Sequence, residues 1–184
     1  MNRLREKCAS GRRLLAFVYD KNGNLTAQED VTGKVTEYRY NLLDQVTEVW
    51  DSGKRLATYT YNPDGTVRSI KNGNSLYTEY AYDADKNLTM LKSVLGEETI
   101  VENHYRYDGN GNRTEKQQLS GRTIYEYDRL NRLSRVEYPG WNEELFYDKA
   151  GNRTGRVAGG VEERYYYDKR NRLTAQEKNG VHTE

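Results

Sequence analysis

Residues 105–114 read Tyr-Arg-Tyr-Asp-Gly-Asn-Gly-Asn-Arg-Thr, and variants of this stretch recur along the chain. A tyrosine followed by Asp or Asn, here called the motif tyrosine, stands at positions 19, 40, 61, 82, 107, 127, 147 and 167. The intervals are 21, 21, 21, 25, 20, 20 and 20 residues. Self-similarity at a short fixed period is the signature of a repeat architecture. The sequence therefore predicts tandem copies of one small unit.

Each copy is expected to form a strand, a turn, a second strand and a second turn. An aromatic residue stands two positions before the motif tyrosine in seven of the eight copies, so both rings share one face of a strand. The Asp or Asn that follows suits the first position of a turn, and four positions after the tyrosine seven copies have Gly, Asn or Asp. These residues tolerate positive φ. A second glycine, such as Gly73, predicts the second turn of each hairpin.

One copy departs from the period. The interval of 25 residues between Tyr82 and Tyr107 indicates a longer hairpin around residues 94–99. Lys86, in the same copy, occupies the turn position where the other copies have Gly, Asn or Asp. The fold class that follows is all-β, an extended, twisted or curled antiparallel sheet of tandem β-hairpins.

The domain organisation is expected to be a single tandem-repeat array. Asn2-Arg3-Leu4 matches Asn131-Arg132-Leu133, and Gly11 falls where the second glycine belongs. Self-contained repeat proteins usually carry atypical terminal units, and neither end shows one. We therefore expect a segment of a longer array. Its expected parts are a half unit at residues 1–12, about eight units at 13–180 and the start of a further strand at 181–184.

Composition narrows the function classes. The formal net charge is only +1, and nucleic-acid-binding domains are usually strongly basic. No nucleic-acid partner is therefore expected. Hydrophobic residues make up 35% of the chain, which argues against a large core, and no apolar run is long enough for a membrane span. Cys8 stands alone and the two histidines are far apart, so neither a disulfide framework nor a zinc site is expected.

No residues suggest catalysis. No Ser/His/Asp arrangement or carboxylate pair stands out, so the chain is expected not to be an enzyme and to need no cofactor. The Asp residues after the motif tyrosines are expected to cap their own turns, since carboxylates about 20 residues apart do not form a calcium loop. Isolated sheet edges and a semi-apolar face predict self-association.

The candidate binding residues are the tyrosine rows. We expect them to be structural rungs of the sheet. The alternative is a carbohydrate-binding or cell-surface adhesion face, because exposed aromatic rings next to Asp and Asn suit sugars. The rows comprise Tyr38, Tyr40, Tyr59, Tyr61, Tyr80, Tyr82, Tyr105, Tyr107, Tyr125, Tyr127, Tyr165 and Tyr167.

The runs Tyr-Asp-x-x-Gly-Asn-Arg-Thr at Tyr107 and Tyr147, and Tyr-Asp-Lys-Asn-Gly-Asn-Leu-Thr at Tyr19, resemble the YD repeat of Rhs proteins. The same repeat occurs in the BC component of bacterial toxin complexes, in wall-associated polymorphic toxins and in teneurins. The resemblance implies a long spiralling β-sheet that closes into a hollow shell around a C-terminal toxin or plug. This chain would then be a partial strip of shell wall in a secreted or cell-surface parent protein.

By this resemblance the partners are the remaining repeats and the toxin domain of the parent, and glycans in the alternative interpretation. The chain departs from the family pattern because neither Pro63 nor Pro139 follows Asp, so it has no shell-closing Asp-Pro motif. Eight units are also too few to close a shell. Enclosure is therefore expected of the parent protein and not of this segment alone.

Overall fold

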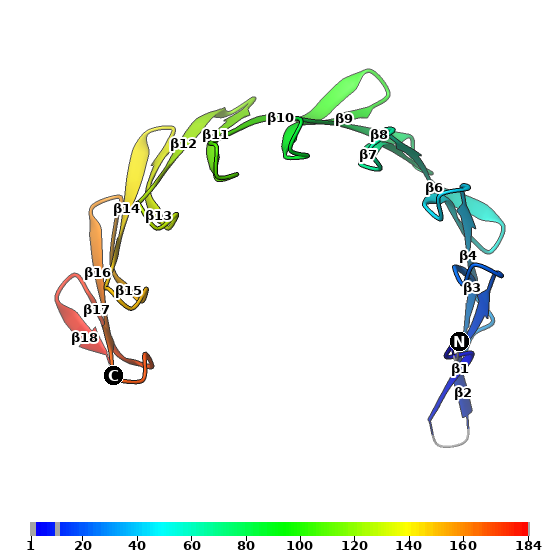
Figure 1. Ribbon diagram of the computed structural model, residues 1–184, viewed down its shortest axis with the longest axis horizontal. Helices are drawn as coiled ribbons and strands as arrows, with labels where there is room; N and C mark the ends of the chain where they lie inside the picture. The colour runs from blue at the N-terminus through cyan, green and yellow to red at the C-terminus, as the bar shows by residue number, and fades with distance from the viewer. Residues whose placement is uncertain (1–2, 10–11, 184) are drawn as a thin grey trace. The chain divides into compact units, whose positions relative to one another are not determined.

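The computed structural model describes residues 3–9 and 12–183, and all regular elements in this part of the chain are β-strands (Figure 1). The chain forms two compact units. Unit 1 comprises Met1–Tyr82 and Leu91–Val101, and unit 2 comprises Asp83–Met90 and Glu102–Glu184. Of the residues singled out in the sequence, Asn2, Gly11 and Glu184 lie outside the described residues.

The strands are short and evenly spaced. Those of unit 1 are β1 Glu6–Ala9, β2 Arg12–Tyr19, β3 Leu25–Asp30, β4 Val35–Tyr40, β5 Val46–Asp51, β6 Lys54–Tyr61, β7 Val67–Asn72 and β8 Leu76–Tyr82. The strands β9 Leu88–Leu95 and β10 Glu98–Tyr107 contribute residues to both units. Those of unit 2 are β11 Arg113–Gln118, β12 Gly121–Tyr127, β13 Leu133–Tyr138, β14 Trp141–Tyr147, β15 Arg153–Ala158, β16 Val161–Tyr167, β17 Leu173–Lys178 and β18 Val181–Thr183.

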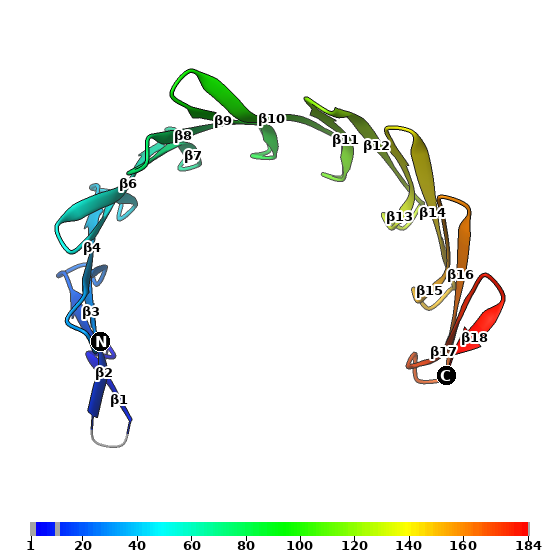
Figure 2. The same ribbon diagram turned by 180° about the vertical axis from the view of Figure 1, so that it is seen from behind.

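Within each unit the strands form an antiparallel meander. From β1 to β8, and again from β10 to β18, each strand pairs with the next strand in the chain. Figure 2 shows the same chain order from behind. The predicted all-β fold of tandem antiparallel hairpins is confirmed. The hairpin of β9 and β10 is also longer than its neighbours, as the interval of 25 residues predicted.

A β-bulge lies beside the motif tyrosine in each pairing across a Tyr-Asp or Tyr-Asn turn described above. Tyr19 pairs with Leu25, whereas Val18 pairs with Ala27, so Thr26 is the extra residue. The same shift occurs at Tyr40, Tyr61, Tyr107, Tyr127, Tyr147 and Tyr167. A bulge of this kind increases the local twist and bends the strand that carries it.

The turn residue four positions after the motif tyrosine has positive φ in all eight copies. Glycine occupies the position in alternate copies and adopts this conformation at little steric cost. Lys86, the one poor match in the sequence, adopts the same conformation with φ 65. The residues are Gly23, Asp44, Gly65, Lys86, Gly111, Asn131, Gly151 and Asn171.

The second turns follow the prediction with one correction. Most use glycine at positive φ, for example Gly33 and Gly140. In the turn between β7 and β8, however, the residue at positive φ is Ser75 rather than Gly73. Gly73 is needed for another reason, because a Cβ there would lie 2.7 Å from the Arg55 carbonyl oxygen.

The core is thin, as the low hydrophobic content predicted. Among the described residues the buried apolar side chains are Val136, which is 1% exposed, and Ala57 and Ala158. Most other strand residues are half-buried. Stability in such a sheet depends on cross-strand pairs and hydrogen bonds more than on an enclosed core.

Candidate functional site

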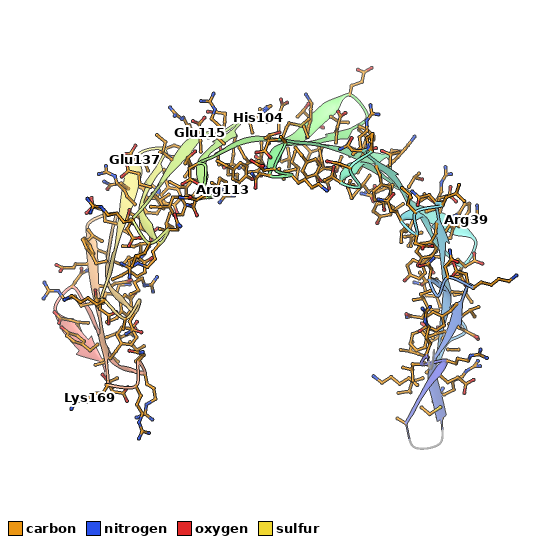
Figure 3. All side chains as sticks on the ribbon, viewed as in Figure 1. Arg39, His104, Arg113, Glu115, Glu137 and Lys169 are labelled. Atoms are coloured by element: carbon orange, nitrogen blue, oxygen red, sulfur yellow. The ribbon has the colours of Figure 1, made fainter. Side chains whose placement is uncertain are left out.

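The twelve predicted tyrosines lie in strands and are all half-buried. We call the face that bears them the tyrosine face and the opposite one the polar face. The register places Lys116 opposite Tyr105 and Val136 opposite Tyr125, so these residues share the tyrosine face. Within unit 2, Figure 3 shows Arg113 on one side of the ribbon and Glu115 and Glu137 on the other.

The motif tyrosines form a repeated hydrogen bond, which we call the tyrosine ladder. The Tyr40 hydroxyl donates to the Leu25 carbonyl oxygen at 2.7 Å, and the Tyr61 hydroxyl donates to that of Val46 at 2.6 Å. Each acceptor belongs to the preceding repeat, six positions after that repeat's own motif tyrosine. Equivalent bonds at 2.9–3.1 Å link Tyr19 to Leu4, Tyr107 to Leu88, Tyr127 to Arg113, Tyr147 to Leu133 and Tyr167 to Arg153.

The ladder bonds lie where backbone pairing between strands stops. The pairing of β3 with β4 reaches Ala27 and Glu37, and the Leu25 carbonyl lies beyond it. Likewise, the pairing of β13 with β14 reaches Arg135 and Glu144, beyond which the Leu133 carbonyl accepts from Tyr147. Because an unpaired carbonyl in a half-buried site is costly, the side-chain hydroxyl takes the place of the missing backbone donor.

Burial raises the pKa of the hydroxyls of Tyr40, Tyr61 and Tyr107 above the ordinary tyrosine value. They therefore remain protonated donors throughout the neutral range. At the N-terminal end, Leu4 accepts from Tyr19 as Leu133 accepts from Tyr147. The structural-rung interpretation explains this geometry directly, since each bond joins one repeat to the next.

The Asp that follows a motif tyrosine caps its own turn, as predicted. One Asp108 carboxylate oxygen accepts the backbone N–H groups of Asn110 and Asn112, both at 2.9 Å. The other oxygen accepts the Asn112 side-chain amide at 3.0 Å. In two later turns an arginine replaces this asparagine, and Nε of Arg132 and of Arg172 donates to the equivalent oxygen at 2.7 Å.

Where the capping residue is Asn, its partner changes from donor to acceptor. The Asn41 side-chain amide donates to Oε1 of Gln45 at 2.8 Å, and that of Asn62 donates to Oγ1 of Thr66 at 2.9 Å. The backbone N–H of Gln45 still bonds to Oδ1 of Asn41. The two side chains of the turn are therefore matched as a donor and acceptor pair in both versions.

Successive turns are also joined along one edge of each unit. The Asn24 side-chain amide donates to Oδ1 of Asp44 at 2.6 Å, and that of Asn152 donates to Oδ1 of Asn171 at 3.0 Å. In both cases the acceptor is the residue at positive φ in the next Tyr-Asp or Tyr-Asn turn. A donor in one repeat therefore holds the strained turn residue of the next.

These hydrogen bonds perturb the capping carboxylates. Hydrogen bonds from the side chains of Asn87, Asn112 and Asn152 are the largest cause that lowers the pKa of Asp83, Asp108 and Asp148, respectively. The backbone N–H of Arg132 does so at Asp128. In the part of the chain that the structure describes, no three His, Cys, Asp or Glu side chains are placed to hold a metal ion.

The sequence interpretation missed a hydroxyl that supports the bulge. Thr26 and Thr47 are the extra bulge residues, and their hydroxyls donate to the Val18 and Arg39 carbonyl oxygens at 3.2 and 3.3 Å. Ser134 and Thr174 make the same contact. The available signal was a hydroxyl residue seven positions after the motif tyrosine, which seven of the eight copies carry.

The sequence interpretation also missed cations that lie over the tyrosine rings. The Arg132 guanidinium lies 4.5 Å from the Tyr147 ring centre, and Arg3 lies over Tyr19 in the corresponding place. Another stacked contact joins Tyr138 and Trp141, whose ring centres are 4.1 Å apart. The tyrosine face therefore carries cation–π contacts and a stacked aromatic pair in addition to the apolar contacts between strands.

The structure gives Cys8 and His104, which the sequence analysis also considered, no sign of a functional role. Cys8 is exposed and is a free thiol. His104 is an exposed strand residue whose Nε2 lies 3.1 Å from a Glu102 carboxylate oxygen. Within the described residues, no helix is long and apolar enough to cross a bilayer.

Residues 19–67 match the family model named RHS Repeat. No curated protein matches the chain. The solved structures that resemble it include "Crystal Structure of TcdB2-TccC3 without hypervariable C-terminal region", with a TM-score of 0.77 and 19% sequence identity. That match covers 87% of this chain and 10% of the solved chain.

A second solved structure, of TcdB2-TccC3-Cdc42, gives a TM-score of 0.71 at 16% identity and covers 88% of this chain and 12% of its own. A third, of TcdB2-TccC3-TEV, gives 0.65 at 19% identity and covers 92% and 9%, respectively. The chain therefore spans about a tenth of the length of these structures, and the likeness is one of fold.

Proposed function

Because this chain belongs to the RHS-repeat, or YD-repeat, family, we propose that it is a non-catalytic structural segment of a repeat wall. In the parent protein this wall would enclose a toxin or another C-terminal domain. The observation that carries the proposal is the tyrosine ladder, in which the Tyr40 hydroxyl bonds to the Leu25 carbonyl of the preceding repeat. A bond repeated from one copy to the next suits a sheet that is extended by adding copies.

The arrangement of polar groups supports a structural role. The aspartates are occupied by turn N–H groups, as at Asp108, and the motif hydroxyls by carbonyl oxygens. Groups committed to the scaffold in this way are not available as acids, bases or nucleophiles. The solved toxin-complex structures with the same fold are about ten times longer than the matched region, which fits a wall segment in a larger chain.

The first test is the sequence that flanks this segment in its gene. We expect further Tyr-Asp repeats upstream, and a shell-closing Asp-Pro motif with a variable domain downstream. Flanking sequence without such repeats on either side would contradict the proposal.

The second test uses the full-length parent protein. Tyr61→Ala and Tyr147→Ala together remove ladder bonds, and Glu126→Ala changes an exposed residue of the polar face as the control. We expect limited proteolysis to spare the downstream domain in the parent and the control, and to cleave it in the ladder variant. Equal cleavage in all three proteins would show that the wall encloses nothing.

A second candidate function is glycan binding on the tyrosine face. Stacked rings favour it, because Trp141 is 44% exposed while it packs on Tyr138. An exposed aromatic surface of this kind suits the apolar face of a sugar. Tyr125→Ala, Tyr80→Ala and Trp141→Ala should then abolish signals on a glycan array without loss of folding. An array with no signal for the unmodified chain would exclude this function.

A further inference from the structure

The tyrosine face of unit 2 carries cations that the structure leaves without an anionic partner. Arg113 and Arg153 are the first residues of β11 and β15, and both are exposed. Among the described residues neither takes part in an ion pair or a side-chain hydrogen bond. Lys116, which lies opposite Tyr105 in the sheet, also makes no ion pair or side-chain hydrogen bond with the described residues. Other arginines in this unit, such as Arg122 with Glu115 at 2.7 Å, are paired with carboxylates.

Tyrosine rings hold the two arginines in place. The Arg113 guanidinium lies 4.6 Å from the Tyr125 ring centre and 5.6 Å from that of Tyr105. Arg153 lies 4.7 Å from the ring centre of Tyr165. Cation–π contacts of this length position a guanidinium while its N–H groups remain free to bind an anion. Less side-chain freedom is then lost when a ligand binds.

The carboxylates on this face do not neutralise these cations. Glu143 accepts from Nε of Arg156 at 2.6 Å. Glu163 lies 3.3 Å from the same guanidinium and 3.7 Å from the Lys178 ammonium group. Both acids are therefore engaged with partners other than Arg113 and Arg153.

Arginine at the position of Arg113 and Arg153 in the repeat is specific to unit 2. The position six residues after the motif tyrosine is Leu or Val in every copy of unit 1, whereas in unit 2 two of its five copies are arginine (Arg113 and Arg153) and the other three are leucine. The ladder carbonyl at this position is retained in both units, for example at Leu25 and Arg113. The arginine side chain is therefore not required for the ladder, since leucine and valine serve there equally well.

Tyr and Arg are the residues enriched at the centres of protein–protein interfaces. The guanidinium fork suits a carboxylate, which it binds with two parallel hydrogen bonds. Arg113 and Arg153 begin strands that are four apart in the meander, which corresponds to about 19 Å across the sheet. About six residues of extended polypeptide span that distance.

We propose that the tyrosine face of unit 2 binds an extended acidic segment of polypeptide, with carboxylates on Arg113 and Arg153. The contact is a property of this face alone and does not depend on enclosure by a complete wall. A wall segment without this contact would still serve the structural function, so the two proposals can fail separately.

The test is fluorescence anisotropy with the complete chain and a labelled peptide of alternating Glu and Ser. A peptide of alternating Gln and Ser is the matched probe without charge. We expect the glutamate peptide alone to bind, and added salt to weaken the binding. Arg113→Gln with Arg153→Gln should weaken it by about tenfold or more, the loss expected for two charge-assisted hydrogen bonds.

The control variant is Arg122→Gln with Arg135→Gln, which removes two cations from the polar face. It should bind the glutamate peptide as the unmodified chain does, and circular dichroism should show all variants folded. Equal binding of both peptides, or an equal loss in the control, would overturn the proposal. Binding of an oligouronate in place of the glutamate peptide would assign the face to acidic glycans instead, and the proposal would be wrong.

Discussion

The Tyr61 hydroxyl lies 2.6 Å from the carbonyl oxygen of Val46, and these two residues belong to successive repeats. Tyr61 ends β6, and Val46 begins the neighbouring strand β5, beyond the last backbone pair of the two strands, Glu48 with Thr58. The bulge beside each motif tyrosine offsets the strand ends in this way. The side chain of one repeat thereby completes the hydrogen bonding of the one before it.

Loss of a ladder hydroxyl should destabilise the sheet. We expect Tyr61→Phe to lower the free energy of unfolding by about 1 kcal/mol, because it leaves the Val46 carbonyl without its donor. Tyr59→Phe, on the same strand and face, is the matched control, since the Tyr59 hydroxyl makes no hydrogen bond to the described residues. Urea unfolding followed by circular dichroism measures both. Equal effects of the two substitutions would show that the ladder bond contributes nothing.

The donor and acceptor matching of the turns can be tested by a double substitution. Asp83→Asn removes the carboxylate oxygen that accepts the Asn87 side-chain amide at 3.1 Å. We expect a loss of about 1 kcal/mol in the free energy of unfolding.

Adding Asn87→Gln to Asp83→Asn recreates the pair seen at Asn41 and Gln45 and should recover most of that loss. Thermal unfolding of the two single variants and the double variant gives the coupling energy. Additive effects would show that the two side chains do not act together.

The caps predict loss of stability in acid. The pKa values of Asp83, Asp108 and Asp148 are lowered in the folded chain, chiefly by hydrogen bonds from asparagine side chains. Their stabilising contribution is therefore complete above the unfolded-state pKa of about 3.9 and is lost as the pH falls through the lower folded-state values.

Replacing Asp108 and Asp148 by Asn should reduce the slope of unfolding free energy against pH below about pH 4. Asp85→Asn is the control for the same chemical change outside the capping position. Urea titrations at a series of pH values provide the measurement. An unchanged slope in the double variant would contradict the assignment.

The turn position at positive φ should discriminate between side chains. Gly65 has φ 88, and its position has no backbone atom within reach of a Cβ. Gly65→Ala is expected to cost about 1–2 kcal/mol through backbone strain alone. Gly65→Asn should cost less, since Asn131 and Asn171 adopt the same conformation in their own turns. Equal destabilisation by the two substitutions would exclude this explanation.

The isolated chain should associate through its sheet edges. Edge strands present unpaired N–H and C=O groups that can pair with a second copy. We expect multi-angle light scattering to show a molar mass that rises with protein concentration. A monomer mass at all concentrations would contradict this prediction.

Most of the local structure could be predicted from the residues. The strand and turn alternation, the long hairpin near residues 94–99 and the Asp caps all depend on interactions within a few positions of the chain. Even Lys86 takes the conformation that the repeat assigns to it, in a turn where its own N–H and that of Asn87 both bond to Asp83. The turn at Gly73 lies where the sequence predicts it, but Ser75 is its residue at positive φ, and the close approach of the Arg55 carbonyl oxygen to Gly73 could not be predicted because Arg55 lies on a neighbouring strand.

The sequence by itself determined the period, the hairpins and the face on which the tyrosines lie, because backbone propensity and side-chain alternation act locally. Only the tertiary structure decided which carbonyl each motif hydroxyl meets, and that Arg113 lies between two tyrosine rings. These contacts depend on the bulge and on the register between strands. Both are set by how neighbouring repeats pack, which no single copy of the motif contains.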